Sequence, residues 1–181
     1  AAKHPDLSLI IYHSGFDVGP PEGPYREDND AGVDRLITSL RRAGIEPGGN
    51  VYAELGSTWR FVMSDPTQAA HVLGKLLVHV GEDNICWGTD SIWYGSPQDQ
   101  IESFRAFEIT PEFQERYGYP ALTPAVKRKI FGGNAAKLHK LDPKAGACRF
   151  EKAELEAFRE RSGRKNLTYG PTTPQGVRKL Q

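Results

Sequence analysis

The sequence predicts an α/β protein in which helices join parallel strands. Three short apolar runs are too brief for helices, and the stretches between them have helical periodicity. The runs, each followed by glycine, serine or threonine, are Leu7–Tyr12, Val51–Leu55 and Ile85–Trp87. Such strands build an open sheet or a barrel whose ligands gather beyond the carboxyl ends of the strands. Functional residues are therefore expected just after each strand.

Two helices are expected between the three strands. Apolar residues recur at helical spacing at Val33, Leu36, Ile37 and Leu40, and again at Val72, Leu73, Leu76, Leu77 and Val80. Asp65 before Pro66 places a capping residue ahead of a proline suited to the first helical position. Ser96 before Pro97 is the same signal after the third strand, so the second and third strands are each followed by a helix.

The rest of the chain is expected to be a helical closing segment followed by an extension. Thr110 before Pro111 and Thr123 before Pro124 predict two short helices. Gly132, Gly133 and Asn134 are expected to break the chain before a last turn that ends near Leu141. We therefore divide the chain into a main domain, 1–141, and a carboxyl-terminal extension, 142–181.

In this extension only residues 152–161 look helical, and 166–181 is rich in turn residues with few apolar anchors. Leu155 and Phe158 form an apolar stripe too narrow for a core, which favours docking on another subunit. We expect the extension to act as an oligomerisation arm in a homo-oligomer.

Composition limits the partners. The 181 residues hold 23 basic and 23 acidic side chains, so no excess charge indicates nucleic acid or an anionic membrane. No apolar run approaches the roughly 18 residues of a membrane span, and the expectation is a cytoplasmic protein acting on a small molecule. The start at Ala1, without a methionine or a leader, suggests a chain that begins mid-protein.

His13 follows the first apolar run, just before a loop rich in glycine and proline. In a parallel α/β enzyme this is a place for a base or a metal ligand. A histidine that is merely hydrogen-bonded in a loop fits the same position. Position alone leaves both interpretations open.

Asp90 follows the third run, two residues after Gly88. A carboxylate there can ligate a cation and accept a proton from water whose pKa the metal has lowered to about 7. The alternative is a cap for the next helical turn. Asp90 is the stronger of the two catalytic candidates.

Other polar and aromatic residues near strand ends are weaker candidates. Glu54 ends the second run and is expected in the wall of the site. Aromatic residues in loops after the second and third runs are candidates to stack on an organic substrate, although aromatic residues in loops more often pack beneath them; they are Trp59, Trp93 and Tyr94. His71 and His79 lie on the expected second helix, where an outer-face or helix-end position is favoured. Glycine-rich phosphate loops, G-x-S-x-G and H-E-x-x-H are absent from the sequence.

Three segments together resemble the amidohydrolase-related family, whose members include aminocarboxymuconate-semialdehyde decarboxylase. They are His4–Gly15 (HPDLSLIIYHSG), Trp87–Asp90 (WGTD) and Lys129–Leu138 (KIFGGNAAKL). In that family a histidine closes strand six of a (β/α)8 TIM barrel, an aspartate closes strand eight, and a Gly-Asn-Ala-Ala segment ends the barrel. The resemblance covers about residues 3–141 and implies a partial TIM-barrel catalytic domain with strands six to eight and their helices.

The resemblance also implies roles for individual residues, and it shows which of the family's metal ligands have no counterpart in this chain. It makes His13 the histidine that positions or deprotonates the attacking water, or ligates metal, and it makes Asp90 the metal ligand and proton acceptor. The family's other ligands, an H-x-H pair on strand one and a histidine on strand five, have no counterpart in this chain. Three strands cannot close a barrel and would leave open sheet edges at strands six and eight. We expect the remaining barrel segment in the same precursor or in another chain.

The sequence thus predicts a metal-dependent hydrolase of the amidohydrolase superfamily, or a related non-oxidative decarboxylase, acting on a small organic substrate through metal-activated water. Zinc is the first candidate metal, with manganese or iron as alternatives. The competing hypothesis is a non-catalytic structural or assembly subunit that retains only the end of the barrel. The missing H-x-H pair favours that alternative, and the presence of both His13 and Asp90 at strand ends speaks against it.

Overall fold

The centre of the fold is a small parallel sheet. The computed structural model describes residues 1–145, 151–162 and 173–179. Its strands are β1 (Leu9–Ile11), β2 (Val51–Glu54) and β3 (Ile85–Cys86), and they lie in the order β1-β2-β3. Both neighbouring pairs are parallel, with Ile11 beside Ala53 and Glu54 beside Cys86. Parallel pairing of all three strands agrees with the predicted fold class, and the described residues form an open sheet.

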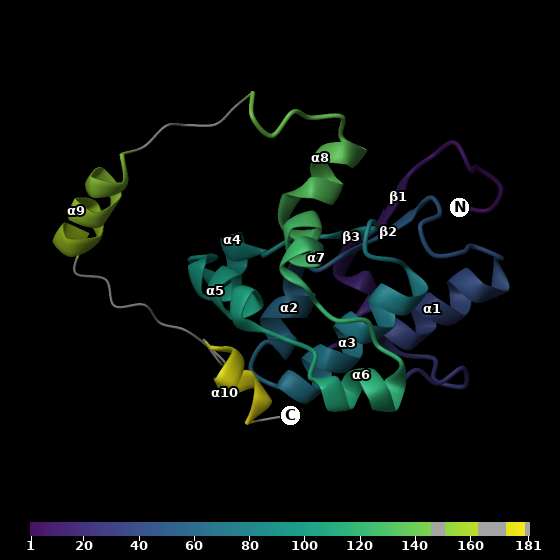
Figure 1. The fold of residues 1–181 in the computed structure, drawn as a ribbon. Coiled ribbons are helices and arrows are strands. Elements are labelled where there is room, and N and C mark those ends of the chain that lie inside the picture. The colour runs from purple at the N-terminus through teal and green to yellow at the C-terminus, as the bar shows by residue number, and fades with distance from the viewer. Residues whose placement is uncertain (146–150, 163–172, 180–181) are drawn as a thin grey trace.

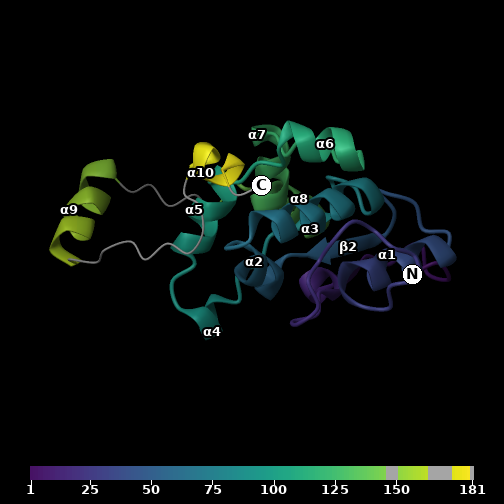
Figure 2. The ribbon, with the colours of Figure 1, turned by 90° about the horizontal axis from the view of Figure 1, so that it is seen from below.

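Helices fill the connections between the strands (Figure 1). The crossovers carry α1 (Gly32–Arg42), α2 (Gly56–Val62) and α3 (Pro66–His79). After β3 come α4 (Ser91–Tyr94), α5 (Gln98–Ala106), α6 (Pro111–Tyr117), α7 (Pro124–Arg128), the π-helical turn η2 (Lys129–Gly133) and α8 (Asn134–Leu138). A 3-10 turn, η1 (Tyr12–Gly15), directly follows β1. Viewed from below, α3 and α8 lie over the region of β2 (Figure 2).

The start signals at Pro66, Pro111 and Pro124 mark helix starts, whereas α5 begins at Gln98, one residue later than predicted, with Pro97 and not Ser96 at the N-cap position. The side chain of Asp65 accepts hydrogen bonds from the N–H groups of Thr67 and Gln68, and Thr123 caps α7 in the same way through Val126. Short helices after strand ends, α2 and α4, were not predicted. Their four to seven residues carry too little periodicity to be recognised.

A buried ion-pair cluster holds the long loop between β1 and α1 against α3. The ammonium group of Lys75 is fully buried and lies 2.5 Å from Glu22 Oε2 and 2.6 Å from Asp34 Oδ1. Glu22 also accepts a hydrogen bond from Val33 N–H, and Asp34 accepts one from the Asn29 amide. Buried charges persist when they are paired and hydrogen-bonded in this way. Three segments of the chain are tied together by this cluster.

The outer edge of β3 is covered, contrary to the expectation of an open edge there. Trp87 N–H donates to the carbonyl of Ile130 in η2 at 3.0 Å. The side-chain amide of Asn134 donates to the carbonyl of Ile85 at 2.7 Å and to that of Glu82 at 2.8 Å. The sequence predicted a chain break at Gly132, Gly133 and Asn134, and this prediction was wrong. The segment is a π-helical turn that continues into α8. The turn directs polar groups at the backbone of β3.

The outer edge of β1, unlike that of β3, is not covered by other described residues of the chain through strand pairing. Within the described ranges no strand pairs with it, and Leu9 and Ile10 are more than one third exposed. An unpaired strand edge with apolar side chains is a template for another strand. The expected open edge is thus present at β1 only.

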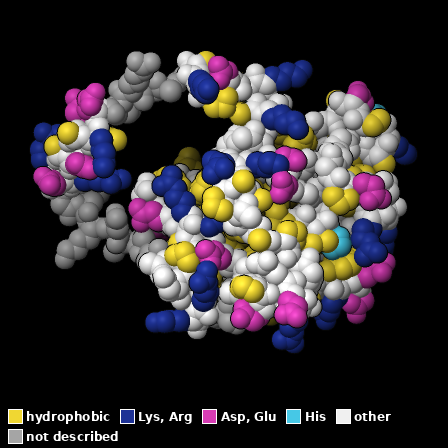
Figure 3. Space-filling view, in the orientation of Figure 1, with side chains coloured by type: hydrophobic (Ala, Val, Ile, Leu, Met, Phe, Trp, Pro, Cys, Tyr) yellow, Lys and Arg dark blue, Asp and Glu magenta, His cyan; other side chains and the backbone are white. Residues whose placement is uncertain are grey.

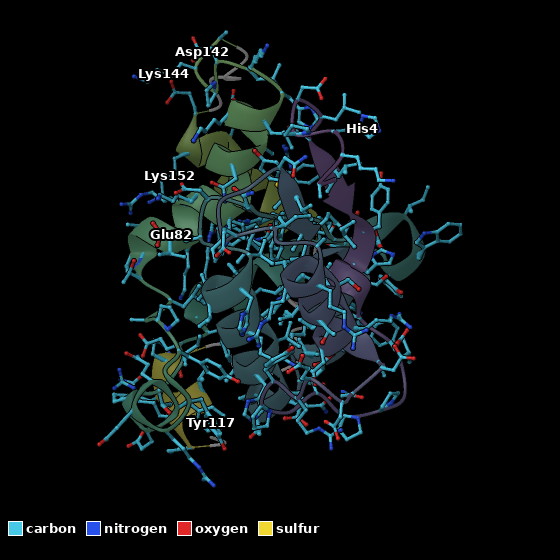
Figure 4. The ribbon with its side chains drawn as sticks, turned by 90° about the vertical axis from the view of Figure 1, so that its right-hand side faces the viewer. His4, Glu82, Tyr117, Asp142, Lys144 and Lys152 are labelled. Atoms are coloured by element: carbon cyan, nitrogen blue, oxygen red, sulfur yellow. The ribbon has the colours of Figure 1, made fainter. Side chains whose placement is uncertain are left out.

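The extension contains two described helices. One is α9 (Lys152–Ser162), where every residue is exposed, and the other is α10 (Pro174–Arg178), where Val177 is fully buried in the core. The sequence predicted the first helix and missed the second, although Thr173 before Pro174 is the same start signal used elsewhere. Figure 4 shows Asp142, where the extension begins, at the end of the molecule opposite Tyr117 of α6.

Surface charge agrees with the balanced composition. On the face shown in Figure 3, basic and acidic side chains are interspersed, with apolar side chains between them. In the described parts of the chain, no helix combines the length and the apolar character needed to cross a membrane.

Candidate functional site

The polar residues that follow the three strands meet at one edge of the sheet. His13 Nε2 lies 3.5 Å from Asp90 Oδ2, and His13 Nδ1 lies 3.6 Å from Glu54 Oε2. The imidazole is 41% exposed, the Asp90 side chain 27% and the Glu54 side chain 12%. Parallel strands bring their carboxyl ends to the same edge of the sheet. His13 and Glu54, 41 residues apart, and Glu54 and Asp90, 36 residues apart, therefore come together. The histidine stands between the two carboxylates.

The backbone at this edge adopts unusual conformations. His13, Ser14 and Asp90 have φ values of 56°, 52° and 48°, in the left-handed region that side chains with a Cβ rarely enter. In the part of the chain that the structure describes, Lys140 is the one other non-glycine residue of this kind. Conformations of this sort cost about 1–3 kcal/mol each and persist where the surroundings impose them, often at functional sites.

Hydrogen bonds from η1 to the end of β2 and to α2 impose the conformation of η1. The hydroxyl of Ser14, which is fully buried, donates to the carbonyl of Glu54 at 2.8 Å. The hydroxyl of Thr58 donates to the carbonyl of His13 at 2.7 Å. The chain after β1 is thereby attached to both ends of the turn between β2 and α2, and the imidazole is directed to the sheet edge.

Glu54 belongs to the wall of the site. Its carboxylate accepts the N–H of His13 at 3.0 Å and the N–H of Gly56 at 2.7 Å. The carboxylate also fills the space beside Gly88, where an added Cβ would lie 1.6 Å from Glu54 Oε1. A carboxylate satisfied by backbone donors orients the turn around it.

Asp90 does not cap α4, which was the alternative interpretation from the sequence. The structure shows no hydrogen bond from its side chain to the start of α4 among the described residues. Instead, Asp90 Oδ2 accepts the hydroxyl of Ser57 at 2.6 Å. Ser57 Oγ is also 3.0 Å from the hydroxyl of Tyr94. The carboxylate is therefore directed toward His13 and Ser57.

The hydrogen bond at Nδ1 determines which nitrogen of neutral His13 carries the proton. Ser57 N–H lies 3.3 Å from Nδ1, so Nδ1 is the acceptor and Nε2 bears the hydrogen. Nε2–H then faces Asp90 Oδ2. Neutral His13 is consequently a donor at the open side of the site.

The remaining candidates lie elsewhere. Trp93 is 78% exposed on α4, so its ring is available at the surface. Trp59 is 1% exposed and donates its indole N–H to the carbonyl of Gln100 at 3.0 Å, which makes it a core residue.

His71 corrects the expectation of an outer-face position. It is buried beside the hydroxyl of Tyr119, which lies 2.9 Å from Nδ1. Burial, followed by the nearby charge of Lys75, lowers the pKa of His71 from 6.5 to about 4. His71 is neutral in the fold at ordinary pH and lies outside the site.

Sequence reasoning missed Ser57, and it named Tyr94 only as an aromatic residue that could stack on a substrate, not as a partner of Ser57. Both follow strand ends, and Ser57 follows Glu54 by three residues, so position gave a signal. Serine and tyrosine are common in loops, however, and their contacts with Asp90 depend on the geometry of α2 and α4.

Comparison with known proteins decides the family. The model of the amidohydrolase family matches residues 1–141. The chain belongs to the amidohydrolase family. No curated protein matches it. Among solved structures, this amidohydrolase is similar to the crystal structure of an amidohydrolase from Burkholderia multivorans with bound zinc, with 21% identity and a TM-score of 0.47. The match covers 78% of this chain and 46% of that one, so the chain spans less than half of that structure's length.

The donor atoms of this amidohydrolase fit part of a metal site. Imidazole nitrogen and carboxylate oxygen are among the ligands that zinc takes in proteins. Asp90 supplies the carboxylate, whereas neutral His13 has no free nitrogen for a metal, because Nδ1 accepts the Ser57 N–H and Nε2 carries the hydrogen. Among the described residues, no cluster of three or more histidine, cysteine, aspartate or glutamate side chains is suited to hold a metal ion. Further ligands would have to come from outside the described residues.

Proposed function

We propose that the chain supplies part of the catalytic centre of a metal-dependent hydrolase acting on a small organic molecule. The observation that carries this proposal is the meeting of His13 and Asp90 at the carboxyl edge of a parallel sheet, in an amidohydrolase. Asp90 is the metal ligand in this proposal. Zinc is the first candidate, with manganese or iron as alternatives.

The two side chains have distinct tasks. A bound divalent metal supplies Lewis-acid activation of water and of the substrate. The carboxylate of Asp90 accepts the proton that the attacking water loses and returns it to the leaving group when the substrate bond breaks. His13 donates from Nε2 and orients the water beside Asp90. Trp93, exposed on α4, is proposed to contact the substrate.

Non-oxidative decarboxylation is a related possibility on the same residues. In that reaction a proton is delivered to carbon as carbon dioxide leaves. Asp90, after accepting a proton from water, would be placed to deliver it to that carbon. Product analysis with candidate carboxylic acids distinguishes the two reactions, because only decarboxylation releases carbon dioxide.

The remaining metal ligands are proposed to lie in further strands that join the sheet at the open edge of β1, in the same precursor or in a second chain. The alternative is a non-catalytic structural or assembly subunit. It is favoured by the absence of a three-ligand cluster among the described residues. The two proposals differ in whether the protein retains metal.

Elemental analysis of the full-length protein tests the choice. We expect near-stoichiometric zinc, manganese or iron in the wild-type protein and in Asp28→Ala, which removes an exposed carboxylate. Asp90→Ala is expected to lose the metal. Equal metal content in Asp90→Ala and wild type would remove Asp90 from the site. A protein without metal would leave the structural subunit as the better account.

A further inference from the structure

We infer that Ser57 is a positioning residue that sets the geometry of both His13 and Asp90. The inference rests on the proposed function, because it assigns to Ser57 the arrangement of that site. Ser57 contacts the two side chains through different groups, its backbone N–H and its side-chain hydroxyl. Each contact constrains one partner.

The backbone N–H of Ser57 fixes the hydrogen on His13. An N–H can only donate, so the imidazole nitrogen that receives it must present a lone pair. The nitrogen that accepts the Ser57 N–H is Nδ1, at 3.3 Å from Ser57 N. The hydrogen of neutral His13 is then on Nε2, the nitrogen that lies 3.5 Å from Asp90 Oδ2. A hydrogen bond to one imidazole nitrogen commonly determines whether the other nitrogen carries hydrogen or a lone pair.

The hydroxyl of Ser57 fixes the carboxylate. The hydroxyl lies 2.6 Å from Asp90 Oδ2 and donates a short hydrogen bond to that carboxylate oxygen. A hydroxyl has one hydrogen, and this one is given to Asp90. The contact with Tyr94 at 3.0 Å must therefore run from the phenol O–H to Ser57 Oγ. Donation from Tyr94 to Ser57 polarises the Ser57 hydroxyl and strengthens the hydrogen bond that this hydroxyl donates to Asp90.

Ser57 itself is held in place by its neighbours in α2. Gly56 N–H is bound by Glu54 Oε1, and the Thr58 hydroxyl is bound by the carbonyl of His13. An added Cβ at Gly56 would lie 2.6 Å from His13 Nδ1, so only glycine allows the imidazole to approach this turn so closely. Three consecutive residues of α2 thus each contact either His13 or Glu54. Ser57 is the one that also reaches the strand-three side of the site.

The test uses the full-length protein with Zn²⁺ as the probe and a competing chelator to measure affinity. Ser57→Ala keeps the backbone N–H and removes the hydroxyl, so zinc affinity should fall about tenfold, as for other groups that orient metal ligands. Ser57→Thr keeps a hydroxyl and should retain the affinity. Tyr94→Phe should lose less than Ser57→Ala, because it removes a bond one step from Asp90.

Two controls separate positioning from a merely structural role. Ser39→Ala removes an exposed hydroxyl on α1 and should leave zinc affinity unchanged. Thermal unfolding of each metal-free variant measures any loss of stability, and the fall in zinc affinity should follow the loss of the Ser57 hydroxyl and not the size of that stability loss. A loss of zinc affinity that parallels a loss of stability across the variants would overturn the inference.

Nitrogen NMR of the imidazole tests the backbone contact. In the metal-free wild type with a neutral imidazole, Nε2 should show the signal of a nitrogen that carries hydrogen and Nδ1 that of a nitrogen without hydrogen. The opposite assignment would overturn the inference. Wild-type zinc affinity in Ser57→Ala, alongside zinc loss in Asp90→Ala, would reject the role of Ser57 and leave the proposed function standing. Unchanged affinity in both variants would reject both.

Discussion

The carboxylate of Glu54 occupies the space that any side chain at position 88 would need. A Cβ on Gly88 would lie 1.6 Å from Glu54 Oε1 and 3.0 Å from the Cα of Gly56, so neither the side chain nor the backbone leaves room for a methyl group. Glu54, Gly56 and Gly88 therefore pack against one another where β2 and β3 end, and a larger side chain at either glycine would displace the Glu54 carboxylate. The close contact between strands is a condition for the site.

Gly88→Ala is expected to displace Glu54 and release its hydrogen bonds to the N–H groups of His13 and Gly56. Leaving such groups unsatisfied costs about 1–3 kcal/mol of unfolding free energy. Urea denaturation measures that loss, and metal content should fall because His13 loses a support. Gly23→Ala, where an added Cβ has open space, is the matched control. Wild-type stability in Gly88→Ala would show that Glu54 can move at no cost.

The buried cluster of Lys75, Glu22 and Asp34 supports the fold and not the chemistry. Lys75→Met is expected to lower the unfolding free energy by about 3–5 kcal/mol, because two carboxylates lose their shared cation inside the protein. Chemical denaturation of Lys75→Met beside Lys3→Met, which alters an exposed lysine, measures the difference. Equal loss in the two variants would contradict the arrangement. A triple variant with apolar residues at all three positions should recover part of the stability.

The lowered pKa of His71 predicts a pH dependence of stability. The folded protein keeps His71 neutral down to about pH 4, whereas the unfolded chain binds the proton near pH 6.5. Stability from this group is therefore complete above pH 6.5, falls as the pH drops toward 4, and changes no further below that. The loss is at most about 1.4 kcal/mol per pH unit within this window.

Urea unfolding at several pH values tests this prediction by difference. His71→Gln removes the titrating group, so its stability should decline less than that of the wild type between pH 6.5 and 4. His4→Gln, at an exposed histidine, should follow the wild-type curve. Parallel curves for wild type and His71→Gln would mean that His71 titrates normally in the fold.

The sequence predicted what depends on local pattern. Apolar runs located the strands, and residues just after them included His13 and Asp90, because a change from apolar to polar residues marks the end of a strand. Ser57 could not be assigned, because its role depends on α2 placing it between two other strand ends. The burial of His71 was missed for the same reason, since helical spacing does not tell which neighbour will cover a face.

The edge of β3 shows a second limit of sequence reasoning. Gly132, Gly133 and Asn134 have the composition of a helix break, yet the structure has a π-helical turn. The extra residue in that turn places the Ile130 carbonyl and the Asn134 amide against the backbone of β3. A tertiary contact of this kind compensates for the poor helix propensity of two glycines, and residue preferences alone do not contain it.

The two described helices of the extension predict different responses to substitution. In α10, Val177 is fully buried, so Val177→Asp should destabilise the domain by burying an unpaired charge. In α9, Leu155 is 49% exposed and Phe158 is 63% exposed, so replacing both with glutamate should leave the unfolding free energy nearly unchanged.

If α9 is the oligomerisation arm, the Leu155→Glu/Phe158→Glu variant should sediment as a smaller species than the wild type. Two charges in an apolar contact between subunits would cost more than the contact gains. Ala153→Glu/Ala157→Glu adds the same charge to exposed positions on the other side of the helix and should keep the wild-type sedimentation coefficient. Identical sedimentation of all three proteins would assign the assembly to another surface, and the open edge of β1, with Leu9 and Ile10 exposed, would then be the next surface to alter.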